Sequence, residues 1–337
     1  MSPALVFSEN HYSPNDYPVP TAHHPAPRHL ISAADLDRPF LDDLFARARD
    51  MEGAVRERGG TDDLRGRVLA TLLYEPSTRT RLSFEAAMVR LGGNVISTEN
   101  AREHSSGAKG ETLEDTARIV GAYADAIVVR HYEEGAAARM AATSPVPVIN
   151  AGDGTGEHPT QALLDIYTML RELGRVDGLR IALVGDLANG RTVHSLCRLL
   201  PLFQDVRLSL VSPPTTRMRR DVLEYLRARG VAYEESDDLA AVAGGVDVLY
   251  QTRVQKERFA DADAYNRAKG LYIVDRALMD ILQPDAIVMH PLPRVDEISR
   301  EVDADPRAAY FRQARNGLFV RMALLTMLLT ATLLDMD

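Results

Sequence analysis

The sequence predicts an α/β protein with two domains, each built on a mainly parallel sheet. The chain has 337 residues, about the length of two domains. Short apolar runs alternate with amphipathic segments along its whole length, which is the pattern of parallel strands covered by helices. Hydrophobic residues make up 45% and charged residues 26% of the chain, as in an ordinary globular protein.

Charge, cysteine content and hydropathy limit the function and the location. The net charge of −9 argues against a general nucleic-acid binder but leaves room for a local pocket that binds a small anion. Cys197 is the single cysteine, so no intramolecular disulfide can form, which fits a reducing compartment. The proline-rich tail, residues 1–28, lacks the apolar core of a signal peptide, and the stretch 322–334 is shorter than the roughly 20 residues of a membrane span. We therefore expect a cytoplasmic protein with no nucleic-acid or membrane partner.

The first half begins with an amphipathic helix. In order, the predicted elements are a helix over 35–58, a strand over 68–74, a helix from Ser77 to Gly92-Gly93, a strand over 94–98, a helix over 111–123, a strand over 125–129, a further helix, and a strand over 146–151. Pro76 ends the first strand because proline cannot donate to a sheet. Ser77 is a favourable N-cap, and Leu82, Phe84, Met88 and Leu91 suit a helix that packs on a core.

The start of the Ser77 helix carries an unusual charge. A first turn normally favours Asp or Glu because the helix dipole is positive there, but this turn holds Arg79 and Arg81 and no acid. Backbone N–H groups, hydroxyls and a guanidinium converge, which indicates a site for phosphate or another anion. The alternative is a solvated helix end whose arginines pair with distant carboxylates.

Polar residues also follow the other strands. Arg130 stands at the end of the strand over 125–129, and His158 and Gln161 lie near the start of a helix over 159–173. Ligands of open α/β sheets bind beyond the carboxyl ends of the strands, so these three residues are candidates for one site, although a helix cap is the alternative for His158. Lys109 lies in a loop of small residues suited to bringing a cation to a ligand; a solvated surface lysine is the alternative.

The second half repeats the alternation of strands and helices. Strands are predicted over 179–184, 206–211, 246–250 and 286–289, with one helix ending near Leu200 and another at Arg229. A long apolar helix over 310–334 follows, and we expect it to be buried between packed units.

Two segments resemble nucleotide-binding motifs, but neither matches its motif fully. Gly185 to Thr192 nearly fits the phosphate loop of nucleotide triphosphatases, but Arg191 replaces the lysine, whose compact charge an arginine does not reproduce. The glycines at 152, 154 and 156 have the wrong spacing for a dinucleotide fingerprint, and Pro159 crowds the turn. No group of Cys, His and acidic residues has the spacing of a metal site, so we expect no metal and no cofactor.

Six segments together carry a resemblance. They are Ser77-Thr78-Arg79-Thr80-Arg81, Arg130-His131, His158-Pro159-Thr160-Gln161, Gly190-Arg191-Thr192-Val193-His194-Ser195, the run from Thr252 to Arg258, and His290-Pro291-Leu292-Pro293-Arg294. In order and spacing they resemble the aspartate carbamoyltransferase family, and the likeness runs from about residue 30 to 334. Members of this family condense carbamoyl phosphate with L-aspartate, giving N-carbamoyl-L-aspartate and phosphate in an early step of pyrimidine synthesis.

The resemblance implies a more detailed architecture. The fold would be two three-layer α/β/α domains linked by two helices, over 159–173 and 310–334. After a tail over 1–28, the carbamoyl-phosphate-binding domain would span 29–160, completed by the C-terminal helix 314–334. The aspartate-binding domain would span 174–309.

The resemblance also assigns roles to single residues. Ser77, Thr78, Arg79 and Thr80 would hold the phosphate, while Thr80, Arg130 and His158 would polarise the carbonyl group and Gln161 would bind the amide nitrogen; Arg79, Thr80, Arg130 and His158 form the expected catalytic set. Arg191, Arg253 and Gln255 would bind the carboxylates of aspartate, with Lys109 and Pro291 beside them. Leu292 would contact both substrates, and its backbone carbonyl would orient the amine. Ser105 and Lys109 would reach the site of a neighbouring subunit, which implies a homotrimer. Glu75 would pair with Arg191 and Arg258 between the domains.

The sequence departs from the family in two places. Tyr132 stands where proline often follows the Arg-His pair, and Ala188 and Asn189 replace the lysine and aromatic residue of members with regulatory subunits. The alternatives are a carbamoyltransferase for another amino acid such as ornithine, an inactive scaffold for a pyrimidine-pathway enzyme, and a nucleotide-binding protein. A relative specific for ornithine would carry cysteine where Leu292 stands. A larger assembly with other pyrimidine-pathway chains stays open.

Overall fold

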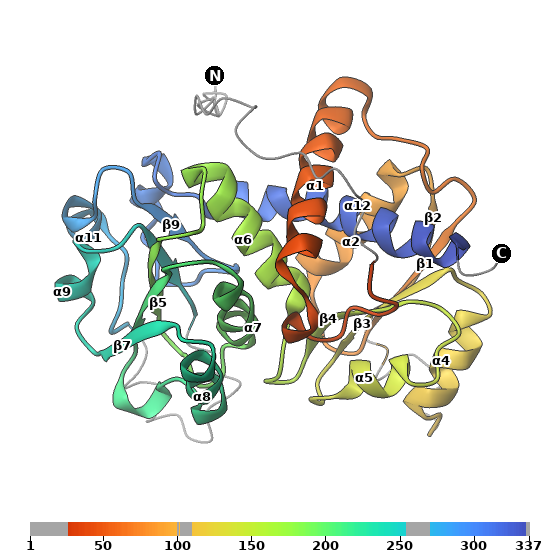
Figure 1. Cartoon of the computed structure of the whole chain (residues 1–337), viewed down its shortest axis with the longest axis horizontal. Coiled ribbons are helices and arrows are strands. Elements are labelled where there is room, and N and C mark those ends of the chain that lie inside the picture. The colour runs from red at the N-terminus through yellow and green to blue at the C-terminus, as the bar shows by residue number, and fades with distance from the viewer. Residues whose placement is uncertain (1–25, 100, 102–109, 254–269, 335–337) are drawn as a thin grey trace.

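The computed structural model describes residues 26–99, 101, 110–253 and 270–334. Two parallel sheets lie side by side, each covered by helices, and two further helices connect the halves (Figure 1). This confirms the α/β fold with two mainly parallel sheets that the alternating pattern predicts.

The first sheet has four parallel strands. They are β1 (Val68–Leu73), β2 (Asn94–Glu99), β3 (Ala126–His131) and β4 (Val148–Asp153), in the order β2-β1-β3-β4. Its helices are α1 (Arg38–Arg58), α2 (Thr78–Arg90), α4 (Leu113–Gly121) and α5 (Ala136–Ala141). Strand β3 was expected to end at Val129, but His131 still pairs with Asp153 of β4, so the polar residues extend the strand instead of following it.

Local sequence explains where these elements begin and end. The side chain of Asp37 accepts a hydrogen bond from Phe40 N at 2.9 Å and starts α1, and Gly59 ends it in the left-handed conformation at φ +80°. Helix α2 buries Phe84 and Met88 on the sheet, as predicted. Leu82, however, is 50% exposed, so the expectation that it packs on this core was wrong.

The second sheet has five parallel strands. They are β5 (Arg180–Val184), β6 (Arg207–Val211), β7 (Ala232–Ser236), β8 (Val248–Gln251) and β9 (Ile287–Met289), in the order β7-β6-β5-β8-β9. The helices are α7 (Arg191–Leu199), α8 (Arg220–Ala228), α9 (Leu239–Ala243) and α11 (Arg276–Ile281). Short 3-10 turns occupy Ala33–Asp35, Leu200–Leu202, Pro214–Thr216 and Arg300–Ala304.

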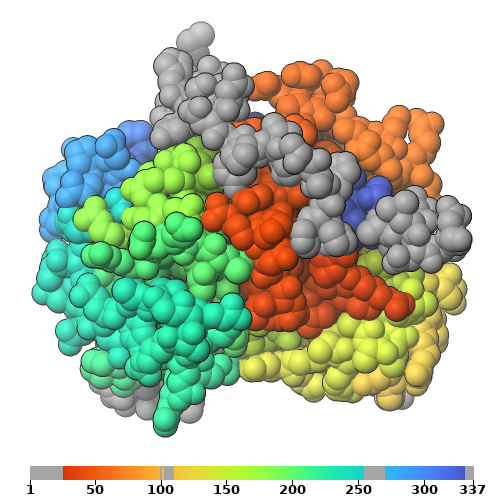
Figure 2. Space-filling model, in the orientation of Figure 1, coloured from red at the N-terminus to blue at the C-terminus, as the bar shows by residue number. Residues whose placement is uncertain are grey.

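Two helices join the halves. Helix α6 (Pro159–Leu173) and helix α12 (Tyr310–Leu334) have the predicted bounds, and α12 contacts α1, α2 and α6 (Figure 1). In the space-filling view, the red-orange segment that includes α1 borders the green segments of the second half (Figure 2). Among the described helices, none is long and apolar enough to cross a membrane.

Candidate active site

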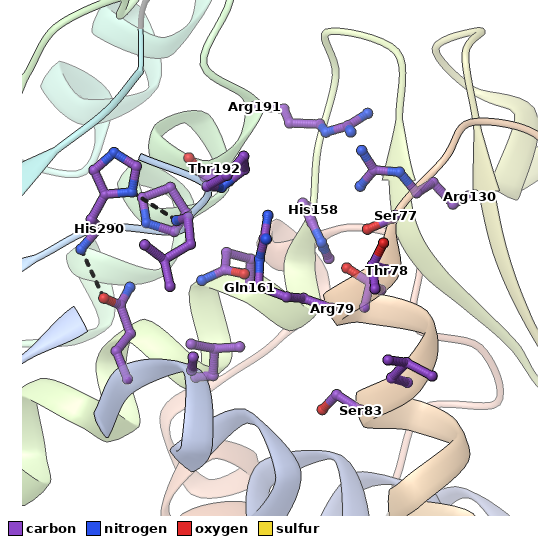
Figure 3. A pocket seen from close by; sticks show the side chains of 18 of the residues that line it. Ser77, Thr78, Arg79, Ser83, Arg130, His158, Gln161, Arg191, Thr192 and His290 are labelled. Carbon is purple, nitrogen blue, oxygen red and sulfur yellow. Dashed lines mark hydrogen bonds between the residues drawn. The ribbon is translucent and has the colours of Figure 1, made fainter. Parts of the chain in front are cut away.

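A cavity of about 880 Å³ lies between the two sheets. Every predicted site residue within the described ranges lines it: Glu75, Ser77, Thr78, Arg79, Thr80, Arg130, His158, Gln161, Arg191, Arg253, Pro291 and Leu292. Figure 3 shows many of these side chains turned toward a common space, from α2, β3, α6, α7 and the loop after β9. The predicted residues Ser105, Lys109, Gln255 and Arg258 lie outside the described residues.

The N-terminus of α2 forms one wall of the cavity. Ser77 occupies the N-cap position as predicted, but its side chain makes no capping hydrogen bond. Its hydroxyl is therefore not used within the helix start. The first turn contains no acidic residue, so backbone N–H groups and the hydroxyls of Ser77 and Thr78 face the cavity together with Arg79. This arrangement suits an anion with several oxygen acceptors.

The two arginines of this motif differ in their partners. Arg81 lies 3.6 Å from Glu85, one turn along the same helix, so its partner is local and not the distant carboxylate of the alternative. Arg79 makes no ion pair with any acidic residue in the described part of the chain. Partial desolvation and the neighbouring guanidinium of Arg253 both lower the pKa of Arg79. A bound dianion would offset this repulsion, since it would supply the missing negative charge.

Glu75 connects two other arginines of the cavity. Its Oε2 atom lies 2.7 Å from Nη2 of Arg191 and 3.0 Å from Nη2 of Arg130. Arg191 also donates from Nη1 to the carbonyl oxygen of Gly154 at 2.9 Å. Glu75 follows β1 and Arg191 begins α7, so this carboxylate ties the first half to the second, as predicted for the Glu75–Arg191 pair.

Gly152 allows the two guanidiniums to approach each other. The residue has φ +117°, and a Cβ atom there would lie 3.0 Å from Cζ of Arg191 and 3.1 Å from Nη1 of Arg130. A side chain would therefore be strained and would displace both arginines. Gly152, one of the glycines that fail as a dinucleotide fingerprint, thus shapes the arginine cluster, a role that the sequence reasoning missed.

His158 is held in its neutral form. The side chain is buried, and burial first, then the charges of Arg130, Arg191 and Arg321, set the pKa of His158 well below its usual value. Its Nδ1 atom lies 3.3 Å from the hydroxyl of Thr160. When that hydroxyl donates to Nδ1, the ring proton is on Nε2, and the imidazole can donate one hydrogen bond to a ligand.

The loop after β9 presents backbone to the cavity. Leu292 has φ +56° and donates its backbone N–H to Nδ1 of His290 at 2.7 Å. No described residue donates a hydrogen bond to the Leu292 carbonyl oxygen. That carbonyl can therefore accept a hydrogen bond from a ligand, as an amine would require.

Arg321 also lines the cavity, and the sequence reasoning missed it. It lies on α12, donates from Nη1 to Ser83 Oγ at 2.8 Å and stacks over the ring of Phe84. Burial lowers the pKa of Arg321 to about 10, partly offset by Asp165. The sequence does contain a pattern that points to this residue, because Arg321 is the single charged residue between 318 and 334. A lone charge in an apolar helix needs a partner or a ligand.

The described residues contain no group of three His, Cys, Asp or Glu side chains placed to hold a metal ion. The cavity presents guanidiniums, hydroxyls, backbone N–H groups and the imidazoles of His158 and His290, beside the carboxylate of Glu75. Such donors can bind anions and stabilise negative charge that develops on an oxygen atom.

Comparisons with known proteins match the two halves of the chain to two domains of one family. Residues 28–171 match the carbamoyl-P binding domain of the aspartate/ornithine carbamoyltransferases, and residues 177–328 match their Asp/Orn binding domain. The chloroplastic aspartate carbamoyltransferase of Arabidopsis thaliana is 60% identical over 301 residues, covering 89% of this chain and 77% of that protein. The aspartate carbamoyltransferase catalytic subunit of Methanococcus vannielii is 50% identical over 302 residues, covering 89% and 98%.

A solved structure agrees with the fold. Aspartate transcarbamoylase from Trypanosoma cruzi, in complex with carbamoyl phosphate and aspartate, is similar with a TM-score of 0.85 and 44% identity, covering 89% of this chain and 96% of that one.

The expectation of a cytoplasmic protein was wrong. Five plant relatives, 56% to 60% identical, are named chloroplastic. The signals used for that expectation were one cysteine and no apolar signal-peptide core. Neither feature separates the cytoplasm from an organelle, since transit peptides have no apolar core.

Proposed function

This chain belongs to the aspartate/ornithine carbamoyltransferase family, and we propose that it transfers the carbamoyl group of carbamoyl phosphate to the α-amine of L-aspartate. The products are N-carbamoyl-L-aspartate and phosphate, as in de novo pyrimidine biosynthesis. One observation carries this proposal: Arg79 at the start of α2 shares a cavity with Arg191 and Arg253 from the other half. A phosphate dianion and a dicarboxylate can thus be bound side by side.

Carbamoyl phosphate binds to the first half. Ser77, Thr78, Arg79 and Thr80 hold its phosphate group, with Ser105 and Lys109 reaching in from another subunit. Arg130, His158 and Thr80 donate to its carbonyl oxygen. This oxygen becomes negative in the tetrahedral intermediate, so donors fixed in advance lower the barrier. The low pKa of His158 supports its role as a neutral donor rather than an acid.

Aspartate binds to the second half. Arg191, Arg253 and Gln255 bind its two carboxylates, and Lys109 contributes a further cation. Pro291 and Leu292 lie beside its amine, which donates to the Leu292 carbonyl oxygen. Ornithine carries an ammonium group in its side chain, which the cluster of guanidiniums would repel. The positive wall of the cavity therefore favours aspartate over ornithine.

The reaction needs little covalent participation by the protein. The amine of aspartate attacks the carbonyl carbon, the C–O bond to phosphate breaks, and the departing phosphate accepts the proton released by the amine. The rate gain comes from holding two small substrates in line and from stabilising the oxyanion. Glu75 acts between the domains by pairing with Arg191 and with Arg258.

We further propose the domain limits and a homotrimer. The carbamoyl-phosphate-binding domain spans 29–160 and includes the helix 314–334, and the aspartate-binding domain spans 174–309. Leu82 and Val89 on α2 and Ile96 on edge strand β2 are 50%, 62% and 42% exposed, an apolar surface on the first half that a second copy can cover. In such a trimer, Ser105 and Lys109 of one subunit would contribute to the site of its neighbour, as the family resemblance implies.

An activity assay tests the function directly. Carbamoyl phosphate is supplied with aspartate, and in parallel with ornithine, and the carbamoylated product is measured. We expect a carbamoylated product with aspartate as the acceptor and none with ornithine. Native mass measurement of the same sample tests the trimer and any larger assembly. A folded trimer that turns over neither amino acid would support the inactive scaffold instead.

A further inference from the structure

Asp165 is a buried carboxylate at the edge of the cavity. It lies on α6, one turn after Gln161, and its side chain is fully buried. Three donors surround it. Gln161 Nε2 donates to Oδ1 at 2.8 Å, Gln313 Nε2 donates to Oδ1 at 2.7 Å, and the Tyr250 hydroxyl donates to Oδ2 at 2.8 Å. Asp165 does not line the cavity, and no step of the proposed reaction uses it.

The orientation of one of these amides is fixed independently. The backbone N–H of His290 donates to Oε1 of Gln313 at 2.8 Å (Figure 3). A backbone N–H can only donate, so this oxygen assignment is unambiguous, and the Nε2 group of Gln313 must point toward Asp165. The Oδ1 atom of Asp165 therefore acts as an acceptor.

The same logic orients Gln161. Because Oδ1 is already an acceptor, Gln161 can only meet it with its Nε2 group. Burial raises the pKa of Asp165 to about 7. When the carboxyl group is protonated, its proton belongs on Oδ2, beside the Tyr250 hydroxyl, since Oδ1 receives two N–H donors. In both protonation states, Gln161 keeps its Oε1 atom for the cavity that it lines.

We propose that Asp165 is a positioning residue, which locks the Gln161 amide with Oε1 toward the ligand and so makes the site select a carbamoyl NH₂ group. This proposal rests on the proposed function, in which Gln161 binds the amide nitrogen. Without Asp165, the Gln161 amide can rotate by half a turn and present N–H donors instead. An NH₂ group and a methyl group are similar in size, so this one acceptor distinguishes a carbamoyl from an acetyl group.

The test compares two stable ligands that differ only in this group. Phosphonoacetamide carries the NH₂ group, and acetonylphosphonate carries a methyl group in its place. Their dissociation constants are measured by calorimetry, without aspartate. For the wild-type protein, we expect phosphonoacetamide to bind about three- to tenfold more tightly, which corresponds to one neutral hydrogen bond.

Four variants separate positioning from a general structural role. Asp165→Leu removes the acceptor, and we expect it to lose the preference for phosphonoacetamide while it binds acetonylphosphonate within about twofold of wild type. Asp165→Asn keeps an oxygen toward Gln161 and can donate to the Tyr250 hydroxyl, so it should keep the preference. Tyr250→Phe removes a different donor to the same carboxylate and should also keep the preference for phosphonoacetamide. Gln161→Leu should lose the preference for phosphonoacetamide.

The outcomes are distinguishable. A folded Asp165→Leu variant that retains the preference, or that weakens both ligands equally, overturns the positioning role. If that variant does not fold by circular dichroism, Asp165→Ala gives the same comparison with less bulk. If Gln161→Leu retains the preference, the proposed role of Gln161 fails. If Gln161→Leu loses it while Asp165→Leu keeps it, Gln161 recognises the ligand without help from Asp165.

Discussion

Arg191 reaches from the start of α7 to Glu75, which follows β1 in the other half of the molecule, with Nη2 and Oε2 2.7 Å apart. The same oxygen also lies 3.0 Å from Nη2 of Arg130. A single carboxylate thus neutralises one proposed carbamoyl-phosphate residue and one proposed aspartate residue. Glu75 therefore couples the geometry of the two substrate sites.

Replacing Glu75 by Gln should slow turnover. The variant keeps the shape but removes the shared negative charge, so Arg130 and Arg191 repel each other. Breaking a fully buried ion pair costs about 3–5 kcal/mol, but Glu75 is 26% exposed, so we expect about 1–2 kcal/mol, near a tenfold loss in kcat. Steady-state kinetics measure it. Glu114→Gln, which breaks the Arg139–Glu114 pair away from the cavity, is the control and should keep kcat. Equal kinetics for both variants would contradict the coupling.

Arg79→Ala should abolish turnover and leave the fold intact. Within the described residues, Arg79 makes no ion pair with an acid, so its loss leaves no buried carboxylate unpaired. The loss of a charged donor to phosphate costs about 3 kcal/mol or more, which is a factor of at least about 100. Calorimetry with inorganic phosphate and the turnover assay give the two readouts. Arg90→Ala, at the other end of α2 and outside the cavity lining, is the control, and it removes only a hydrogen bond to the carbonyl oxygen of Gly59. Near wild-type turnover of Arg79→Ala would refute the phosphate assignment.

Gly152→Ala should impair aspartate binding more than the fold. An alanine at φ +117° is strained, and its Cβ would meet the guanidiniums of Arg191 and Arg130. We expect KM for aspartate to rise about tenfold or more, together with a lower melting temperature. Gly59→Ala is the matched control, because Gly59 also has a positive φ but has open space around its Cβ position. This control should lower the melting temperature and leave KM for aspartate unchanged. The same KM change in both variants would exclude a displacement of the arginines.

The fold was largely predictable because hydrophobic runs mark buried strands. Strands β1 and β8 are almost wholly buried, and each was predicted from such a run. Strand β7 was missed because it lies at the sheet edge and is largely exposed, so Ala232–Ser236 carries no apolar pattern. Helices α9 and α11, of five and six residues, are too short to show a helical period.

The residues proposed to contact the ligands could be predicted from the sequence, whereas those that act through a neighbouring side chain could not. Arg79 and His158 lie in segments that resemble a family, so the sequence points to them directly. Gly152 and Asp165 act by allowing or fixing the positions of other side chains. Their effect depends on distances between chain segments, such as Asp165 to Gln313, that no local pattern encodes.

The neutral state of His158 predicts acid-sensitive stability. The unfolded chain takes up a proton as the pH falls below about 6.5, while the folded protein, with a lowered pKa, does not. The contribution of His158 is therefore present at neutral pH and is lost as the pH falls. We expect the stability of wild type, relative to His158→Asn, to decrease between pH 7.5 and 5. Urea unfolding at several pH values measures this difference, and a constant difference would contradict it.

Asp165 predicts a pH dependence of opposite sign. Burial raises the pKa of Asp165 from 3.8 to about 7, so the folded protein holds this proton more tightly than the unfolded chain. The stabilising contribution is present below about pH 4 and is lost as the pH rises through about 7, when a charge must be carried in the interior. Asn at this position carries no charge at any pH. We therefore expect Asp165→Asn to gain stability relative to wild type between pH 4 and 8, in the same urea experiment. If the stability difference between Asp165→Asn and wild type does not change with pH, Asp165 is ionised throughout, and Gln161, Gln313, Tyr250 and Arg321 stabilise its charge.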